Sequence, residues 1–403
     1  NILTGLETRE KTVSCILPEQ QSLFGNVGLL DLFTECLIPI NANELQTPDG
    51  KSTCFVGKWN EANVIVLPFD VGTIFLNKRV ADKSFYSSNK RLPFEQVALV
   101  SKNSLRRLVI TSLEYLHRQR NIPFVHKWYF PENTSPVFAF RIDTDYANQS
   151  EIVKLYSLSQ KYQIPFTWFV DVKSQQDFLS LFARMDNQEI GIHCFEHETF
   201  SDYERNYQNI QKAKQLLQSN HIDAVGFAAP FGKWNEALGR AIQDSGFEYS
   251  SEFSYDYDNL PSFPVIDGKV SSFLQVPIHP ISIGTLKRLG YSDEEMINYF
   301  RFVIEQKHQA REPIILYHHP KDGHEKVLES IFKTVQQLQL PAVRFAEYVS
   351  FWKNRGESEL HTVNKCSPLP EDYLRIRKFN LWIQFIHFQD KTVGKIKKLL
   401  SQG

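Results

Sequence analysis

The chain has 403 residues, which at roughly 150 residues per domain predicts two or three domains with room for a buried core. Its 42% hydrophobic and 23% charged residues, with only 18 glycines and 19 prolines, exclude collagen-like, low-complexity and wholly disordered classes. Because 45 Lys and Arg almost balance 46 Asp and Glu, no global charge would recruit nucleic acid or an anionic membrane.

Cysteine usage and hydropathy bear on the cellular compartment. The five cysteines are scattered without C-x-x-C spacing, which disfavours a disulfide scaffold and favours a reducing compartment. The chain has no apolar run of transmembrane length, and its opening segment NILTGLETREKTV lacks the apolar core of a signal peptide. We therefore predict a cytoplasmic protein without a transmembrane segment or a nucleic-acid partner, with a removed leader as the open alternative. The sequence leaves the oligomeric state open.

The first 130 residues combine short strands, turn signals and one longer helical pattern. A strand is predicted over Asn63–Pro68, a turn at Pro48–Gly50, and a helix from Phe94 to about Arg118. We interpret residues 1–130 as a smaller N-terminal α/β domain of unknown role. The turn-forming segment PENTSP, at residues 131–136, is the predicted boundary.

From residue 137 onward, β-rich apolar runs alternate with helical periodicity, which predicts an α/β fold with a parallel sheet or barrel. Eight strands are the upper count: Val137–Ile142, Phe166–Val170, Glu189–Ile192, Val225–Ala228, Phe247–Ser250, Phe273–Val276, Pro313–Tyr317 and Ala342–Phe345. Ser201 with Glu204, and Ser292 with Glu295, predict capping boxes at two helix starts. Gly246 predicts a helix end.

The tail, residues 356–403, is basic, aromatic and amphipathic. We expect a helical extension that packs its aromatic side chains against the protein. Peripheral contact with an anionic membrane surface is the alternative.

Three clusters of reactive side chains follow predicted strands, where parallel α/β folds place their active sites. The first holds Asp143 and Asp145. One carboxylate could bind a cation while the other accepts a proton. The alternative is that the two acids cap a turn or a helix. In the second, His193 and His197 are four residues apart, a spacing that can converge on one metal ion. With an Asp from another strand end they would form a catalytic His₂Asp set.

The third cluster is a strand that ends in His318 and His319. One of them could be a general acid near neutral pH, although a structural histidine is the alternative. Because side chains alternate along a strand, only one of the two can face the site, and the sequence does not decide which.

In order and spacing, the three clusters resemble the motifs of the polysaccharide deacetylase family, the NodB-homology type, over roughly Val137 to Trp352. Arg141–Asp145 is similar to an R-x-D-x-D variant of the opening T-F-D-D-G motif, and His193–His197 is similar to H-[S/T]-x-x-H with Cys194 in the hydroxyl position. The last motif, L-x-H, would align His318, whereas an L-x-x-His-Pro ending would align His319.

Two motifs depart from the family pattern. Ala228–Gly232 resembles R-x-P-[Y/F], but Ala228 stands where relatives have an Arg that helps to hold the catalytic Asp. Arg141 or Lys233 is the expected substitute. The fourth motif is only loosely similar to Phe253–Asp258 and lacks the Trp of the family.

The resemblance implies a distorted (β/α) barrel of about seven strands over residues 136–355, with its site at the carboxyl ends of the strands. It implies a metal-dependent carbohydrate N-deacetylase that removes an N-acetyl group from a sugar or polysaccharide, for example a bacterial surface polysaccharide. A catalytically silent glycan- or protein-binding module on the same barrel, or a hydrolase of another C–N bond such as a cyclic amide, are the alternatives.

The resemblance also implies roles for individual residues. A divalent ion, zinc first and cobalt or nickel as alternatives, would be held by Asp145, His193 and His197. Asp143 would be the base, and His318 or His319 the acid. Contacts with the substrate or the oxyanion are expected from Pro230, Phe231, Tyr255 and Asp256.

Overall fold

The computed structural model describes residues 7–19, 21–85, 87, 91–131 and 135–357. The described residues up to Lys353 form one compact unit. Most of the tail predicted to be helical, and residues 132–134 of the predicted boundary, lie outside the described residues. Within the described part, no helix is long and apolar enough to cross a bilayer.

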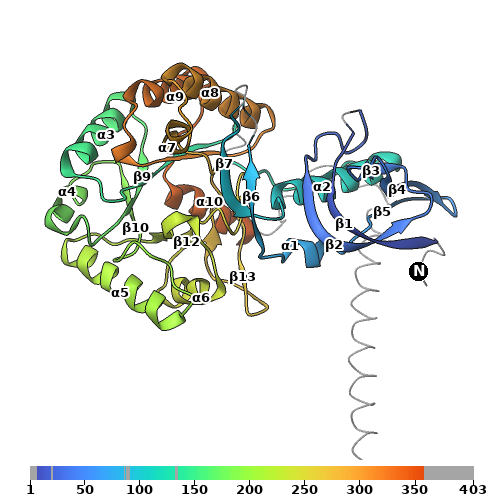
Figure 1. The fold of residues 1–403 in the computed structure, drawn as a ribbon, viewed down its shortest axis with the longest axis horizontal. Coiled ribbons are helices and arrows are strands. Elements are labelled where there is room, and N and C mark those ends of the chain that lie inside the picture. Colours follow the sequence, from blue (N-terminus) through green and yellow to red (C-terminus); the bar gives the residue numbers. More distant parts are fainter. Residues whose placement is uncertain (1–6, 20, 86, 88–90, 132–134, 358–403) are drawn as a thin grey trace, which may run out of the picture. The chain divides into compact units, whose positions relative to one another are not determined.

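A parallel sheet forms the centre of the larger part of the chain (Figure 1). Its seven strands lie in the order β15 (Leu274–Gln275), β12 (Tyr249–Ser250), β11 (Gly226–Phe227), β10 (Glu189–Ile192), β9 (Phe166–Val170), β8 (Phe138–Asp143) and β16 (Ile314–His318). The sheet curls, because the N–H of His279, which follows one edge strand, donates to the carbonyl of Ile315 in the other edge strand (2.8 Å). The predicted (β/α) barrel of about seven strands is confirmed.

Helices surround the curled sheet (Figure 1). The α-helices of this part are α3 (Gln149–Tyr162), α4 (Leu179–Phe182), α5 (Tyr203–Ser219), α6 (Glu236–Asp244), α7 (Ile283–Arg288), α8 (Asp293–Gln309), α9 (Glu325–Gln337) and α10 (Phe345–Glu357). Single 3₁₀ turns are η2 (Gln176–Phe178), η3 (Pro230–Gly232) and η4 (Pro320–Asp322). Two short strands, β13 (Val265–Ile266) and β14 (Lys269–Val270), pair outside the barrel.

Alternation along the buried strands decides which side chains reach the interior of the barrel. In β8, Phe138, Phe140 and Ile142 pack in the core between the sheet and the helices. Ala139 belongs to the second core, inside the barrel, together with Tyr249 and Ile315 of other strands. Arg141 and Asp143 lie on the same inward face, nearer the carboxyl end of the strand. Alternation along the strand therefore places these polar side chains at one end of the barrel.

The structure corrects some local predictions. The strand predicted at Ala342–Phe345 is a single bridge between Phe138 and Ala342, because α10 already begins at Phe345. The capping box predicted at Ser201 is replaced by Asp202, whose carboxylate accepts from the N–H of Arg205 (2.9 Å).

Two predicted helix ends are confirmed. The capping box of Ser292 and Glu295 is present at the start of α8. Gly246 follows α6 with a positive φ of 73°, the conformation that glycine adopts at least cost.

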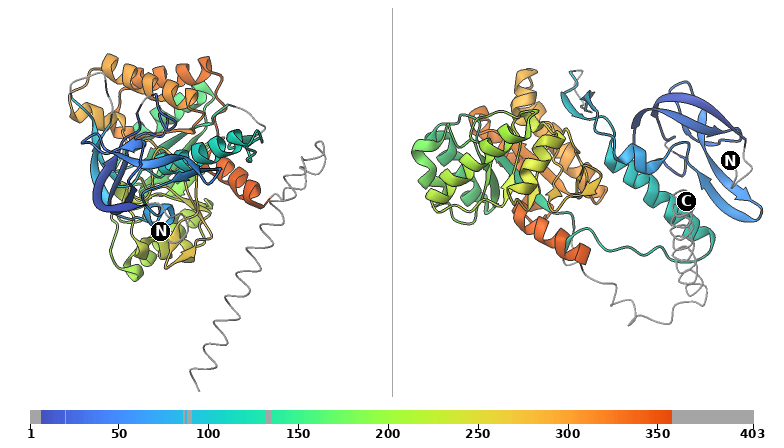
Figure 2. Two further views of the ribbon diagram at one scale, coloured as in Figure 1. Left: turned by 90° about the vertical axis from the view of Figure 1, so that its right-hand side faces the viewer. Right: turned by 90° about the horizontal axis from the view of Figure 1, so that it is seen from below.

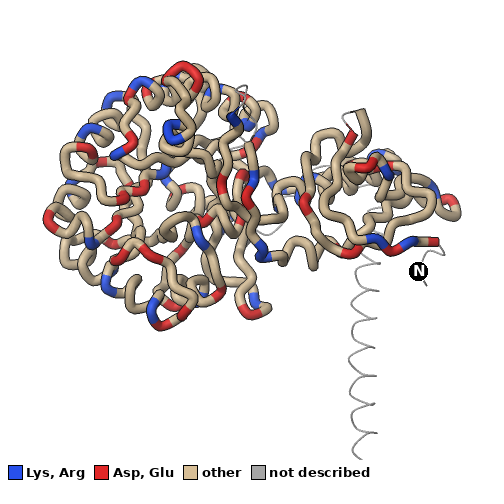
Figure 3. Tube along the Cα trace, viewed as in Figure 1, with Lys and Arg blue, Asp and Glu red and all other residues tan. Residues whose placement is uncertain are grey.

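The strand-rich N-terminal region is coloured blue in Figures 1 and 2. It holds β1 (Thr8–Ile16), β2 (Leu30–Pro39), β3 (Glu44–Gln46), β4 (Ser52–Trp59), β5 (Ala62–Val66), α1 (Val71–Phe75), β6 (Val80–Ser84), β7 (Phe94–Ala98) and α2 (Lys102–Gln119). The helix predicted from Phe94 is wrong over its first residues, because Phe94–Ala98 pairs with β6 and α2 begins after the N-cap Ser101. Basic and acidic residues are interspersed along the chain in Figure 3.

Candidate active site

Asp145, His193 and His197 come from two different strand ends and meet in space. Asp145 lies two residues beyond β8, and His193 directly follows β10. The Nε2 atoms of His193 and His197 are each 3.1 Å from the Asp145 Oδ1 atom, and one ligand atom from each of the three residues lies within 4.8 Å of the others. Metal–ligand bonds of about 2.0–2.2 Å place neighbouring donors of a tetrahedral site about 3.3–3.6 Å apart. The three side chains therefore fit a divalent metal ion.

Hydrogen bonds orient the two histidines and the carboxylate. The buried His193 has its Nδ1 atom 2.6 Å from the carbonyl oxygen of Ala228. Such a bond keeps a proton on Nδ1, so that a metal ion can replace the proton on Nε2, which faces Asp145. Burial alone would raise the pKa of Asp145, but the hydrogen bonds from His193 and His197 hold this pKa well below its usual range. The carboxylate is therefore ionised, as a metal ligand must be.

Arg141 holds Asp143 from the same strand. Its Nε and Nη2 atoms donate to the Oδ1 and Oδ2 atoms of Asp143 at 2.6 and 2.7 Å, and its Nη1 atom donates to the carbonyl of Ser251 (2.5 Å). Residues two apart in a strand share a face, which allows Arg141 to form two parallel hydrogen bonds with Asp143. Of the two expected substitutes for the missing family Arg, the structure brings Arg141 to Asp143. The Nζ atom of Lys233 lies instead over the ring of Phe231, 5.2 Å from its centroid.

The two histidines at the end of β16 point to opposite sides. His319 has its Nε2 atom 3.4 Å from the Asp145 Oδ2 atom and its Nδ1 atom 3.2 Å from the Asp322 Oδ2 atom. His318 shares the outward face of Leu316 and is buried, and burial lowers its pKa to about 3. The structure thus brings His319, and not His318, to the other site residues.

A cavity of about 410 Å³ opens over these groups. It is lined by Glu95, Asp143, Asp145, His193, Phe231, Gly232, Phe253, Arg288, Tyr317, His319, Lys321 and Asp322. Phe231 is 62% exposed and has a φ of 58°. A left-handed conformation is costly for a bulky residue and is found where function requires it. The exposed ring also contacts the edge of His197, with 5.0 Å between ring centroids.

Other predicted substrate residues lie apart from the cavity. Pro230 is buried in the turn below Phe231. Asp256 is fully buried, where burial raises its pKa to about 6, and it accepts from the Asn259 side chain (2.9 Å). The ring of Tyr255 packs against Trp234. The structure does not bring Tyr255 or Asp256 to the cavity, because their loop turns toward Lys102 of α2, whose Nζ donates to the Tyr255 carbonyl.

The sequence reasoning missed several residues of the site. Asp322 contacts His319. The sequence gives only a weak indication of this contact, namely an acidic residue three positions after a histidine. Gly284 is a second example, because a Cβ atom there would lie 2.1 Å from the Asp322 Oδ2 atom. Glu95 and Arg288 reach the cavity from distant parts of the chain, so their positions in the sequence give no indication of their place in the site.

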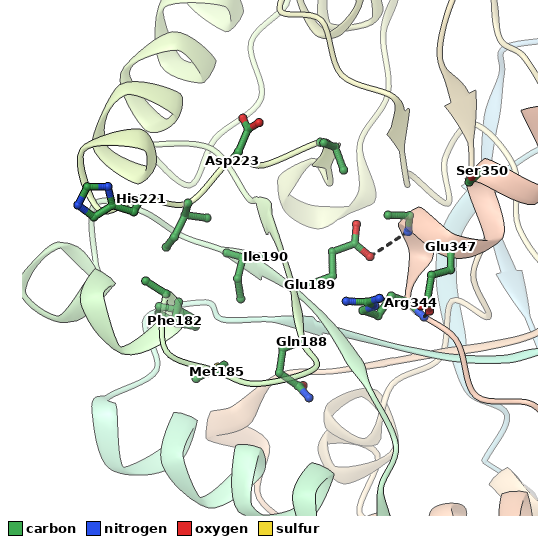
Figure 4. Close-up of a pocket in the computed structure, with 14 residues that line it drawn as sticks. Phe182, Met185, Gln188, Glu189, Ile190, His221, Asp223, Arg344, Glu347 and Ser350 are labelled. Carbon is green, nitrogen blue, oxygen red and sulfur yellow. Dashed lines mark hydrogen bonds and ion pairs between the residues drawn. The ribbon is translucent and has the colours of Figure 1, made fainter.

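A larger cavity of about 670 Å³ lies at the amino-terminal end of β10 (Figure 4). Three of its charged groups, Glu189, Arg344 and Glu347, have partners. Glu189 accepts from the hydroxyl of Tyr249 (2.5 Å) and from the N–H of Ala346 (2.9 Å), and Arg344 donates to Glu347 (2.7 Å). This cavity is remote from the candidate metal ligands and offers no comparable set of reactive groups.

Comparison with known proteins shows what the barrel is similar to. No curated protein matches the chain. Three solved structures resemble it: a protein from Mycobacterium smegmatis described as a polysaccharide deacetylase (14% identity, 62% of this chain and 99% of that chain, TM-score 0.48); one from Pseudomonas aeruginosa PAO1 with the same description (15%, 60% and 99%, TM-score 0.49); and the peptidoglycan deacetylase PdaC from Bacillus subtilis (15%, 55% and 94%, TM-score 0.40).

The model of the family named polysaccharide deacetylase matches residues 132–250, which include Asp143, Asp145, His193 and His197. The order of the motifs in the sequence and this match agree. Residues 132–250 are therefore similar to the polysaccharide deacetylase family.

Proposed function

We propose that the protein is a metal-dependent hydrolase that removes an N-acetyl group from a sugar or polysaccharide. One observation carries this proposal. One cavity is lined by members of three groups: Asp145 and His193 of the candidate ligand set, Asp143 of the Arg141–Asp143 pair, and both residues of the His319–Asp322 pair. Metal-assisted amide hydrolysis uses each of these parts, namely a cation site, a base and an acid.

Asp145, His193 and His197 would hold the metal ion, which when bound lowers the pKa of water and polarises the acyl oxygen. Asp143 accepts the proton of the attacking water, and the Arg141 fork holds its carboxylate in position. His319 donates a proton to the leaving amine from Nε2, while Asp322 accepts from Nδ1 and fixes the ring. The backbone N–H of Phe231 is our candidate for stabilising the oxyanion.

Zinc is the ion we propose first, with cobalt or nickel as alternatives, because a His₂Asp set accepts several divalent metals. The division into a 1–130 region, a 136–355 barrel and a 356–403 extension remains our proposal. So do the cytoplasmic location and the role in a bacterial surface polysaccharide. Among the described cysteines, all are free thiols, which is typical of a reducing compartment.

Metal content and acetate release test the proposed function. We expect about one divalent ion per chain in the wild type, and none in the His193→Ala/His197→Ala double variant. We also expect acetate from at least one of a panel of N-acetylated oligosaccharides. If no ion binds after incubation with zinc, cobalt or nickel, the hydrolase proposal fails in favour of a silent binding module. Hydrolysis of a cyclic amide, with no acetate released from the panel, would indicate a different C–N substrate.

The role of His319 as the general acid can be tested against a matched control, His318, at the same end of β16. His319→Gln is expected to lower kcat by about 10²–10⁴-fold, the usual contribution of a general acid. His318→Gln, one residue away on the opposite face, is expected to retain activity in its folded fraction. Equal losses in the two variants would contradict the assignment of the acid to His319.

A further inference from the structure

The β6–β7 hairpin of the N-terminal region forms part of the wall of the catalytic cavity. The two strands pair from Val80 with Ala98 to Ser84 with Phe94. The N–H of Ala98 donates to the carbonyl of Phe253 (3.1 Å), and Val97 is fully buried in the core inside the barrel. Phe253 itself lines the cavity. The hairpin is thus anchored by a backbone hydrogen bond and by apolar packing directly beside the site.

Strand alternation aims one side chain of the hairpin into the cavity. Glu95 and Val97 are two residues apart and share a face, whereas Phe94 and Gln96 lie on the other, more exposed face. Since Val97 points into the barrel core, Glu95 points the same way one step nearer the opening. There it lines the same cavity as Asp143 and His193.

The carboxylate of Glu95 is largely uncommitted. Its Oε1 atom accepts from the N–H of Gln96 (3.0 Å). Lys83, its neighbour across the hairpin, is paired with Asp31 instead (2.5 Å). Among the described residues, no cationic nitrogen lies within 4 Å of Glu95, so acceptor capacity remains for a ligand.

A guanidinium faces the same cavity. Arg288 ends α7 and donates to the hydroxyl of Thr285 (3.3 Å), and no carboxylate of the described residues lies within 4 Å of it. Burial raises the pKa of Glu95, and the charge of Arg288 acts in the opposite direction. The wall therefore offers a strong acceptor and a strong donor beside the reactive groups, a combination that suits a ring bearing hydroxyls rather than an apolar acyl chain.

We propose that Glu95 is a substrate-positioning residue whose carboxylate accepts hydrogen bonds from hydroxyls of the sugar ring that carries the acetamide. This inference rests on the proposed function and extends it. It gives the N-terminal region a role, because the hairpin sets the selectivity of the barrel for amino sugars with free ring hydroxyls. A site built to bind a hydroxyl rejects analogues that lack it.

Kinetics of Glu95→Ala and Glu95→Gln test this role, with Gln96→Ala on the opposite face as the matched control. The substrates are the N-acetylated oligosaccharide that the wild type hydrolyses fastest and 4-nitrophenyl acetate, which has no sugar ring. For the oligosaccharide we expect Glu95→Ala to raise KM about 10- to 100-fold, as for a lost hydrogen bond to a charged group. Glu95→Gln, which keeps one acceptor oxygen, should show a smaller rise. Gln96→Ala should leave the KM for the oligosaccharide unchanged. In the Glu95 variants, the zinc content and the rate of aryl acetate hydrolysis should equal those of the wild type.

The outcomes separate this inference from the proposed function. If the wild type releases acetate but Glu95→Ala keeps its KM, the hydrolase stands and the role of Glu95 is refuted. If aryl acetate hydrolysis or zinc content falls together with oligosaccharide hydrolysis, Glu95 only maintains the site, and the inference is again overturned. If the wild type releases no acetate from any oligosaccharide, the proposed function fails and the inference fails with it.

Discussion

The guanidinium of the fully buried Arg141 meets both oxygens of Asp143, at 2.6 and 2.7 Å. The partner of the proposed base is thus built into the same strand. Only the alternation of the strand is needed to align the two groups, so a departure at Ala228 does not leave Asp143 without a cation. A buried fork of this kind fixes the direction of the carboxylate as well as its charge.

Replacement of Arg141 tests this dependence. Arg141→Gln leaves the carboxylate of Asp143 buried without its partner, and we expect a loss of about 3–5 kcal/mol in the free energy of unfolding. We also expect kcat/KM to fall by about 10²-fold or more, because the base is no longer held in place. Arg141→Lys keeps the positive charge but not the two parallel hydrogen bonds. Its stability and its kcat/KM should lie between those of the wild type and those of Arg141→Gln. Urea unfolding and steady-state kinetics measure both effects, and an unchanged kcat/KM in the folded variant would contradict them.

Glu252 is a second buried acid at the residue scale. Its Oε1 atom accepts from the N–H of Ala229 (3.0 Å), and its Oε2 atom lies 2.8 Å from the hydroxyl oxygen of Ser250. That hydroxyl is also 2.9 Å from the Oε1 atom of Gln275, so a protonated Glu252 completes the chain of donors. Burial raises the pKa of Glu252 to about 7.

This shift gives a pH dependence with a definite sign. The folded state binds the proton of Glu252 more tightly than the unfolded state, so its contribution to stability is present at low pH and is lost as pH rises toward 7. Between pH 8 and pH 5, the stability of the wild type should rise by about 2–3 kcal/mol relative to that of Glu252→Gln. Urea unfolding of both proteins across this range measures the difference. Parallel curves for the two proteins would show that Glu252 is ionised throughout.

At the element scale, the short helix α7 and the turn η4 together orient His319. The Nζ atom of Lys287 in α7 donates to the carbonyl of Asp322 in η4 (3.0 Å). The second residue of α7, Gly284, packs against the carboxylate of Asp322, and no other residue type leaves that space free. The position of the proposed acid therefore depends on two elements that meet only in the folded barrel.

Gly284→Ala should disturb this arrangement without touching the metal ligands. The added Cβ would displace the Asp322 carboxylate, so we expect kcat to fall by about 10²-fold, with metal content retained. Asp322→Asn is expected to have a similar effect, and the double variant should be little worse than either, since both act on the same contact. Additive losses in this double-mutant cycle would instead show that Gly284 acts through another neighbour.

At the scale of the whole molecule, one buried carboxylate joins the N-terminal region to the barrel. Glu312, next to β16, accepts from the side chains of Asn103 (2.6 Å) and Arg107 (3.0 Å from Nε) on α2. Arg106 lies 3.6 Å away. Since α2 follows the β6–β7 hairpin in the chain, this cluster helps to hold Glu95 at the cavity.

Loss of this cluster should lower global stability. Glu312→Ala removes hydrogen bonds to charged groups, and we expect a decrease of about 1.5–3 kcal/mol in the free energy of unfolding. The matched control is Glu248→Ala, since Glu248 is 48% exposed in its pair with Lys353 and such pairs contribute less than about 1 kcal/mol. Thermal or urea unfolding compares the two variants. Equal effects would contradict a special role for Glu312.

The sequence by itself determined the parallel fold and predicted most of the residues of the candidate site. Buried strands such as Phe138–Asp143 have a strong local signal, because apolar runs between helical segments are typical of parallel sheets. The ligand candidates Asp145, His193 and His197 were predictable because parallel strands bring their carboxyl ends to one edge. These inferences need only local patterns and one rule of topology.

Only the tertiary structure decided what depends on distant partners. It assigned Phe94–Ala98 to a strand, because β6 offers backbone hydrogen bonds that local helical periodicity does not reveal. It separated His319 from His318, because the registry of β16 with β8 fixes which face is inside. It removed Tyr255 and Asp256 from the cavity and added Glu95, since side-chain positions on loops and hairpins follow from packing against segments far away in the chain. Such contacts are absent from any local pattern of residues.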